Sequence, residues 1–140
     1  MSHSPHISTD KSLLQLDTIH SVLKESYWAK NIPLEILKRS IENSICFGVY
    51  IEKEQIGFCR VITDKATFAY LADVFIVEEH KGKGYSKQLM KEVMAHHELQ
   101  GLRKFLLGTV DAHGLYKKYG FKELAMPERM MEISVKDIYR

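Results

Sequence analysis

The stretch from Leu71 to His97 constrains the fold more than any other part of this sequence. It begins with a run of β-forming residues, Leu71 to Val77, that contains one carboxylate, Asp73. A short charged loop with two glycines, Gly82 and Gly84, comes next. Beyond it, apolar residues recur at spacings of three and four, which predicts an amphipathic helix. This order of strand, glycine loop and helix gathers free backbone N–H groups at the positive end of the helix dipole.

The glycine loop therefore predicts a phosphate-binding site, because glycine lets an anion approach the backbone with no Cβ in the way. A plain turn before a helix is the alternative, since glycine pairs are common there. The loop is not a Walker loop, because the Gly-Lys-Ser/Thr ending is missing. It also lacks the third glycine of the dinucleotide-binding fingerprint.

The loop resembles the acyl-CoA loop of the GNAT superfamily of N-acetyltransferases. That loop usually reads Gln/Arg-x-x-Gly-x-Gly/Ala after a strand ending in Val-x-Pro, and Lys81-Gly82-Lys83-Gly84-Tyr85-Ser86 follows this pattern here. Lys81 replaces Gln/Arg, Ser86 replaces the small final residue, and Glu78 replaces the proline. Lysine keeps the positive charge and serine stays small, so the pattern is preserved in its physical character.

A second run, Asp111 to Phe121, carries the same resemblance. GNAT proteins have a Leu/Phe-Tyr-x-x-x-Gly-Phe run after the strand that follows the CoA loop, and Leu115-Tyr116 with Gly120-Phe121 is similar to it. The two runs occur in the family's order, separated by one helix and one strand. The resemblance covers residues 68–124, and residues 50–64 look like the preceding hairpin.

The resemblance implies an α/β (α+β mixed sheet) architecture, a GNAT-like acyl-CoA N-acyltransferase fold in which helices flank a central splayed mixed β-sheet. Residues 1–140 would form a single domain. It also implies transfer of the acetyl group of acetyl-CoA to a primary amine by direct attack in a ternary complex, with coenzyme A as co-product. Tyr116 would protonate the leaving sulfur, with core packing of its ring as the alternative. The expected cofactor-binding residues are Val74, Phe75, Ile76, Lys81, Gly82, Lys83, Gly84, Tyr85, Ser86, Lys87 and Asp111.

The general base is less sharply defined by the sequence. Asp73 is the only carboxylate within the central strand, where partial desolvation would raise its pKa and suit it to proton abstraction. A salt bridge to Arg60 is the competing interpretation. Asp111 and His113 are rival bases, and His113 precedes Tyr116 by three residues, so one helical face could carry both.

An aromatic pair, Tyr27 and Trp28, interrupts the pattern between two predicted helices. We expect these two residues to bind the acceptor, with Phe68 and Tyr70 as further candidates. Burial in the core is the alternative for each of them. The acceptor would be a small-molecule or peptide amine.

Periodicity predicts the remaining elements. A short strand is expected near residues 7–10. Helices are expected over residues 16–27, with Asp17 as a possible cap, from Pro33 onward, from the glycine loop to about Gln100-Gly101, and over 112–119. Strands are expected at 45–52, 55–62, 67–77, 103–109, 121–124 and 130–135.

Composition narrows the class of protein. The formal net charge of +2 is too small to indicate nucleic-acid binding, and no apolar run approaches transmembrane length. The sequence shows neither a signal-peptide pattern nor a metal-ligand pattern. We expect Cys46 and Cys59 to be reduced core residues of a cytoplasmic protein. We expect no membrane partner, and a monomer or homodimer. A non-catalytic acyl-CoA binding module and a nucleotide-binding regulatory domain are the alternative functions.

Overall fold

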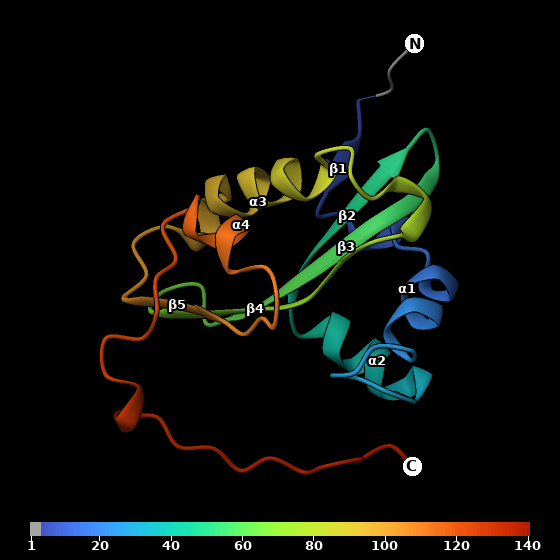
Figure 1. Ribbon diagram of the computed structural model, residues 1–140. Coiled ribbons are helices and arrows are strands. Elements are labelled where there is room, and N and C mark those ends of the chain that lie inside the picture. The colour runs from blue at the N-terminus through green and yellow to red at the C-terminus, as the bar shows by residue number, and fades with distance from the viewer. Residues whose placement is uncertain (1–3) are drawn as a thin grey trace.

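The computed structural model describes residues 4–140 and is built around a mixed sheet of five strands (Figure 1). The strands are β1 (His6–Ser8), β2 (Ile45–Ile51), β3 (Glu54–Thr63), β4 (Phe68–Ile76) and β5 (Lys104–Leu107). They lie in sequence order across the sheet. The first four pair antiparallel, and β5 pairs parallel to β4. The parallel pair follows from the helix that connects its strands, and the predicted mixed sheet is confirmed.

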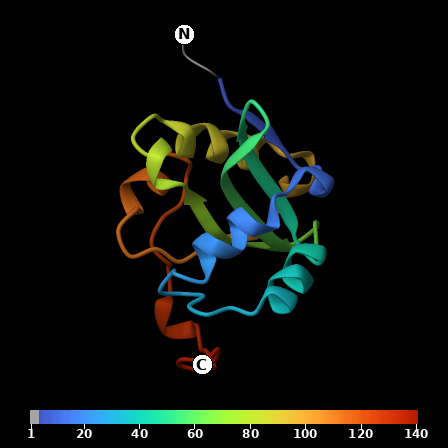
Figure 2. The ribbon, with the colours of Figure 1, turned by 90° about the vertical axis from the view of Figure 1, so that its right-hand side faces the viewer.

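Two pairs of helices cover the sheet on opposite faces (Figures 1 and 2). The helices are α1 (Leu16–Leu23), α2 (Leu34–Glu42), α3 (Tyr85–Ala95) and α4 (His113–Lys117). Helices α3 and α4 pack on one face, and α1 and α2 pack on the other. Adjacent strand residues accordingly enter different cores. Phe58 lies in the core beside α1 and α2, whereas Cys59 lies in the core beside α3.

A bulge in β4 changes the direction of this strand near its centre. Phe58 pairs with Phe75, but Arg60 pairs with Ala72, so β4 contains one residue more than β3 in this interval. Within it, Asp73 has a φ of 56°, in the left-handed region that Asp and Asn enter more readily than most residues.

The sheet opens next to this bulge. The pairing of β5 with β4 ends at Leu107 and Leu71, while β4 continues to Ile76 along β3. Beyond Leu71, the edge of β4 that faced β5 is therefore unpaired with it. This is the splayed sheet that the sequence predicted.

Three helices are shorter than predicted, and one of them is α4, which spans His113–Lys117 where residues 112–119 were expected. Helix α1 ends at Leu23, and its first residue is preceded by Gln15, not by the predicted cap Asp17. Helix α3 ends at Ala95, because His96 adopts an extended conformation and its Nδ1 accepts a hydrogen bond from the Glu98 N–H at 3.1 Å. This bond begins a 3₁₀ turn over His97–Leu99 and competes with continuation of the helix.

The two strands predicted at residues 121–124 and 130–135 are wrong. Residues 122–140, called here the C-terminal arm, contain one 3₁₀ turn (Pro127–Arg129) and no strand. Figure 1 shows the arm leaving the region of β5 and running below the sheet. Alternating apolar residues suit a strand, but a strand also needs an edge to pair with, and the arm pairs with none in residues 4–140.

Two further expectations can be compared with the structure. Cys46 and Cys59 are buried and unpaired, as predicted. Within residues 4–140, no helix has the length and apolar character needed to span a membrane.

Candidate active site

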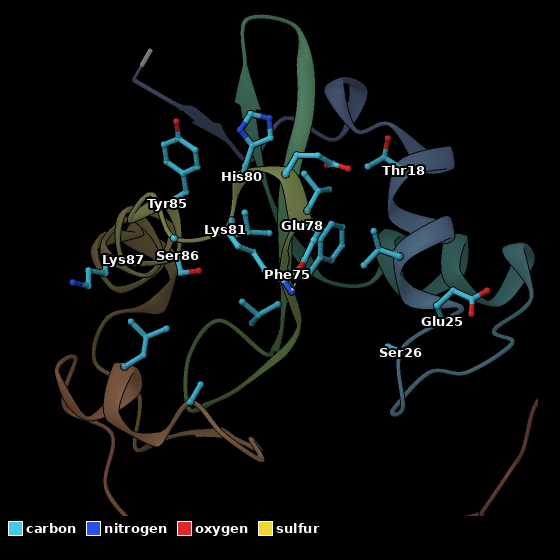
Figure 3. A pocket seen from close by; sticks show the side chains of 18 of the residues that line it. Thr18, Glu25, Ser26, Phe75, Glu78, His80, Lys81, Tyr85, Ser86 and Lys87 are labelled. Atoms are coloured by element: carbon cyan, nitrogen blue, oxygen red, sulfur yellow. Dashed lines mark ion pairs between the residues drawn. The ribbon is translucent and has the colours of Figure 1, made fainter. Parts of the chain in front are cut away.

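A cavity of about 1010 Å³ lies between α1 and the start of α3, with the end of β4 at its back. Figure 3 shows Thr18 and Glu25 on the α1 side and Tyr85 and Ser86 on the α3 side, with Phe75 of β4 between them. Most of the predicted cofactor-binding residues line this cavity. They are Val74, Phe75, Ile76, Lys81, Gly82, Gly84, Tyr85, Ser86 and Lys87.

The glycine loop has the conformation that an anion site needs. Gly82 and Gly84 have φ values of 80° and 81°, which L side chains rarely adopt. A Cβ added to either would meet no atom within 4 Å, so the space above the backbone is open. Gly84 occupies the N-cap of α3 without a side-chain hydrogen bond, and the first turn holds no acidic residue. The positive end of the dipole of this eleven-residue helix is therefore not neutralised by an acidic side chain of its first turn, which favours an anion there.

The loop lysines differ in their contacts. Lys81 forms an exposed ion pair with Glu78 at 2.9 Å. Nζ of Lys83 lies 3.4 Å from Nδ1 of His80, and Lys83 does not line the cavity. Lys87 lines the cavity, and its carbonyl accepts a hydrogen bond of 2.8 Å from the hydroxyl of Tyr119. This last bond fixes the segment after α4 against the first turn of α3.

A second cavity, of about 740 Å³, lies where β4 and β5 separate, lined by residues 70–74 from one strand and 107–112 from the end of the other and the loop after it. The predicted acceptor residues Tyr27 and Trp28 line it, and so does Tyr70. Phe68, the fourth aromatic candidate, does not. The ring centroids of Tyr27 and Trp28 are 5.0 Å apart in an edge-to-face arrangement.

The two cavities share part of their walls. Tyr116 lines both, as do Val74, Ala112, Tyr27 and Trp28. Figure 1 shows α4, which carries Tyr116, beside the end of α3 and above the opening of the sheet. A group held in one cavity can therefore approach a group held in the other at Tyr116.

Tyr116 is 7% exposed, and burial raises its pKa to about 12. Its ring packs edge-on against Phe121 at a centroid distance of 6.1 Å. No hydrogen bond to its hydroxyl is formed within residues 4–140. The phenol is thus protonated at neutral pH and available as a donor.

Asp73 takes part in a network beside the second cavity. Its Oδ2 forms an ion pair with Nε of Arg60 at 2.5 Å, and its Oδ1 accepts a hydrogen bond from Nε1 of Trp28 at 2.7 Å. Nη1 of Arg60 also donates to Ser44 Oγ at 3.1 Å. The salt bridge that competed with a catalytic interpretation of Asp73 is therefore present, and both carboxylate oxygens are engaged.

The rival bases occupy different places. Asp111 is exposed and lines the second cavity, not the first, so its placement does not favour the predicted contact with the cofactor. His113 lies at the start of α4, three residues before Tyr116 in the same helix, but it lines neither cavity. Thr109 lines the second cavity, and its Oγ1 accepts a hydrogen bond from the N–H of Ala112 at 3.0 Å.

One wall of the first cavity was not predicted from the sequence. This wall comes from α1 and the residues after it, namely Thr18, Ser21, Val22, Glu25 and Ser26. The same region gave only an amphipathic pattern, and small polar residues on the outer face of a helix look like any solvated surface. No group of three or more His, Cys, Asp or Glu side chains in residues 4–140 is arranged to hold a metal ion.

Comparison with known proteins agrees with this geometry. A family model described as the acetyltransferase (GNAT) domain matches residues 42–123. A protein of Gibberella zeae assigned as an acetyltransferase is 33% identical over 153 residues, covering 92% of this chain and 85% of the relative.

Solved structures extend the comparison. A crystal structure from Xanthomonas campestris, assigned to the GNAT family, is 52% identical with a TM-score of 0.95, covering 97% of this chain and 96% of that one. A crystal structure from Staphylococcus aureus is 19% identical with a TM-score of 0.74, covering 95% and 99%, and is similar in fold alone. On the domain match, the Gibberella relative and the Xanthomonas structure together, this chain belongs to the GNAT family of acetyltransferases.

Proposed function

We propose that this protein transfers the acetyl group of acetyl-CoA to a primary amine. The observation that carries the proposal is that two cavities meet at Tyr116, one with an open anion site and one with aromatic and acidic walls. Bound in the first cavity, acetyl-CoA supplies an acetyl group activated as a thioester. The second cavity then holds the amine.

The first cavity suits acetyl-CoA in charge and in shape. The backbone at Gly84 and the positive N-terminal end of α3 would bind the diphosphate, since the N-cap residue Gly84 makes no side-chain capping bond. The unpaired edge of β4 at Val74, Phe75 and Ile76 would offer backbone hydrogen bonds to the pantetheine arm. Lys81, Lys83 and Lys87 would add positive charge around the diphosphate.

Tyr116 acts as the general acid in this proposal. Its hydroxyl is protonated at neutral pH, since burial raises its pKa to about 12. A donor placed at the junction of the two cavities protonates the thiolate as it leaves, and the hydrogen bond stabilises the developing charge before the proton moves.

Asp111 is the proposed binding group for the acceptor ammonium and the acceptor of its proton. It is the carboxylate of the second cavity that is not engaged in an ion pair, whereas Asp73 is paired with Arg60. The aromatic faces of Tyr27 and Tyr70 would attract the same cation. Asp73 then has a positioning role, because it holds Trp28 in the wall shared by the two cavities.

Direct transfer in a ternary complex is favoured over a covalent enzyme intermediate. A cysteine nucleophile needs an accessible thiol of low pKa. Cys46 and Cys59 are 1% and 0% exposed, and burial raises the pKa of each thiol, that of Cys46 to about 11. Neither lines either cavity. Their unpaired state also supports the proposed cytoplasmic location.

The proposal is tested by two measurements on the full chain. Thermal shifts with acetyl-CoA, coenzyme A and ATP identify the ligand of the first cavity, since only a ligand of the native state stabilises it. Release of free thiol from acetyl-CoA is then followed with polyamines, amino acids and peptide N-termini. Stabilisation by ATP alone would favour a nucleotide-binding domain. Stabilisation by acetyl-CoA without turnover on any amine would favour an acyl-CoA binding module.

A further inference from the structure

The second cavity presents one unpaired charge to a ligand. Three charged side chains line it, those of Arg60, Asp73 and Asp111. Arg60 and Asp73 neutralise each other in an ion pair that leaves their side chains 17% and 7% exposed. Asp111 is exposed and has no ion-pair partner within residues 4–140. One guanidinium and two carboxylates give the cavity a formal charge of −1, which a single ammonium group balances.

Aromatic and aliphatic side chains form most of the remaining wall of this cavity. Tyr27, Trp28 and Tyr70 line it while being 71%, 47% and 39% exposed, so none of the three rings is fully used in core packing. The aliphatic residues that line it are Leu71, Val74, Leu107 and Val110. An apolar wall with a few polar groups is typical of small-molecule sites. The wall thus suits a ligand with an apolar body and a single charge.

Tyr70 lies across the point where β4 and β5 separate. Its register partner in β5 is Leu106, and its hydroxyl lies 3.6 Å from the place that a Cβ on Gly108 would occupy. The ring therefore reaches the end of β5, and Asp111 follows Gly108 by three residues in the loop after that strand. Neighbouring parts of the wall thus contribute an aromatic ring and the unpaired carboxylate.

Asp111 also lies near the proposed general acid. Burial is the main cause of the raised pKa of Tyr116, and the negative charge of Asp111 contributes to the rise. Since the interaction of two charges weakens with distance, this contribution places the carboxylate near the phenol. An ammonium group bound to Asp111 is therefore close to the junction of the two cavities, where Tyr116 lines both.

We propose that the acceptor is an arylalkyl monoamine, meaning a primary amine with one positive charge, an aromatic body and no other charged group. This inference rests on the proposed function, since it names the amine that the second cavity holds. The ammonium binds Asp111, and the aromatic body packs among Tyr27, Trp28 and Tyr70. As the amine nitrogen bonds to the acetyl carbon, the bond from that carbon to sulfur breaks. One ammonium proton leaves through Asp111, and a second replaces the proton that Tyr116 donates to sulfur.

Other amines fit the cavity less well because of their additional charges. The second ammonium of a polyamine would meet aromatic rings and the Arg60–Asp73 pair, in which both carboxylate oxygens are already engaged. The carboxylate of an amino acid lies a few bonds from its ammonium and would therefore be held near Asp111, which repels it. Arg60 does not compensate, because its Nε is bound to Asp73 and its Nη1 to Ser44.

The test compares kcat/KM for matched amines on the full chain, measured by thiol release at saturating acetyl-CoA. Phenethylamine and phenylalanine differ by a carboxylate, and we expect phenethylamine to be preferred by about 100-fold. Butylamine and putrescine differ by one ammonium, and butylamine should be preferred by about 10-fold. Phenethylamine should exceed butylamine by about 10-fold, because only its ring fills the aromatic part of the cavity. Phenylalaninamide keeps the ring without the negative charge and should recover most of the activity that phenylalanine lacks.

Two variants of β4 locate the preference in the second cavity. Tyr70→Leu removes a ring that lines the cavity and should reduce the preference for phenethylamine over butylamine by about fivefold. Phe68→Leu is the matched control. Phe68 is 38% exposed and lies two residues earlier in the same strand, but it does not line the cavity, so the preference should be unchanged.

Amine binding in the absence of acetyl-CoA provides a readout that needs no turnover. Trp28 is the single tryptophan of the chain and lines the cavity, so its fluorescence should respond to phenethylamine and not to phenylalanine.

The outcomes separate this inference from the proposed function. A kcat/KM for putrescine or phenylalanine that equals or exceeds that of its matched monoamine would overturn the inference and leave the proposed function intact. An equal loss of preference in Phe68→Leu and Tyr70→Leu would do the same. Selective binding of phenethylamine with no turnover of any amine would support the class of ligand and overturn the proposed function. Neither binding nor turnover of any amine would overturn both.

Discussion

The indole Nε1 of Trp28 donates a hydrogen bond of 2.7 Å to Oδ1 of Asp73, joining the loop after α1 to the bulge of β4. The other oxygen of Asp73 is paired with Arg60. The ion pair is largely buried, with the side chains of Arg60 and Asp73 17% and 7% exposed. The wall shared by the two cavities therefore depends on a charged residue in a left-handed conformation.

We expect Asp73→Asn to reduce the free energy of unfolding by about 2 kcal/mol, because it leaves the Arg60 guanidinium without its counter-charge. Asparagine tolerates the positive φ of this position, so the change isolates the charge from backbone strain. Denaturant unfolding measures the loss. The double variant Arg60→Gln/Asp73→Asn should recover part of it. Full stability in Asp73→Asn would mean that the pair contributes nothing to the fold.

Tyr116→Phe should lower kcat for acetyl transfer by about 100-fold or more, the range typical of a lost general acid. The dissociation constant for acetyl-CoA should stay within about threefold of the wild type, because the ring that packs against Phe121 is retained. Thiol release and calorimetric binding measure the two quantities. An unchanged kcat would remove Tyr116 from the chemistry and leave it a packing residue.

The pH dependence of stability should show a loss at high pH. Burial raises the pKa of Tyr50 and of Tyr116 to about 12, against about 10 in an unfolded chain. The folded state therefore holds these protons more tightly, and stability that is complete below pH 10 falls as the pH rises toward 12. Each group contributes at most about 1.4 kcal/mol per pH unit.

Urea unfolding between pH 9 and pH 12 checks this prediction, and Tyr116→Phe should reduce the slope. Tyr50→Phe should reduce it as well. It should also maintain or raise stability at neutral pH, since the buried Tyr50 hydroxyl has no hydrogen-bond partner within residues 4–140. A slope that neither variant alters would contradict the assignment to these phenols.

Gly84→Ala should cost about 1 kcal/mol of stability, because its φ of 81° disfavours any L side chain even though the space is open. It should also weaken acetyl-CoA binding, since the first amides of α3 would shift. Gly114→Ala is the matched control. Gly114 lies in α4 with an ordinary φ and open space, so alanine should leave stability unchanged or improve it.

Asp111→Asn should raise KM for the amine by about 10-fold or more, the value of a hydrogen bond between charged groups. The affinity for acetyl-CoA should not change, because Asp111 lines only the second cavity. Initial rates at varied amine and saturating acetyl-CoA measure the effect. Weakened acetyl-CoA binding would instead restore the cofactor contact that the sequence resemblance implied for this residue.

The central part of the fold was predictable because its signals are local. Residues within a few positions of one another determine the strand before the glycine loop and the amphipathic stripe of α3. The same holds for the two loop glycines, whose φ values are 80° and 81°. The order of these elements then fixed a parallel β5 and the location of the anion site. The two cavities around Tyr116 followed from that order, which is why most predicted site residues were brought together.

The errors arise where the hydrophobic pattern does not describe a specific hydrogen bond or the partner that a segment needs. Periodicity extended α3 to Gln100, but a single side chain, His96, ends the helix at Ala95 by bonding the Glu98 N–H. Alternation in the arm suggested strands, but pairing depends on an edge that the pattern does not describe. The hydrogen bond from Trp28 to Asp73 was not predicted, because Trp28 is 45 residues away in the chain.

The early end of β5 at Leu107 has a consequence for where two ligands can bind. Since β4 continues past it, the two cavities lie along different stretches of this strand, residues 74–76 for the first and 70–74 for the second. In the proposed function, the cofactor and the amine would therefore occupy different cavities, and neither would have to bind before the other.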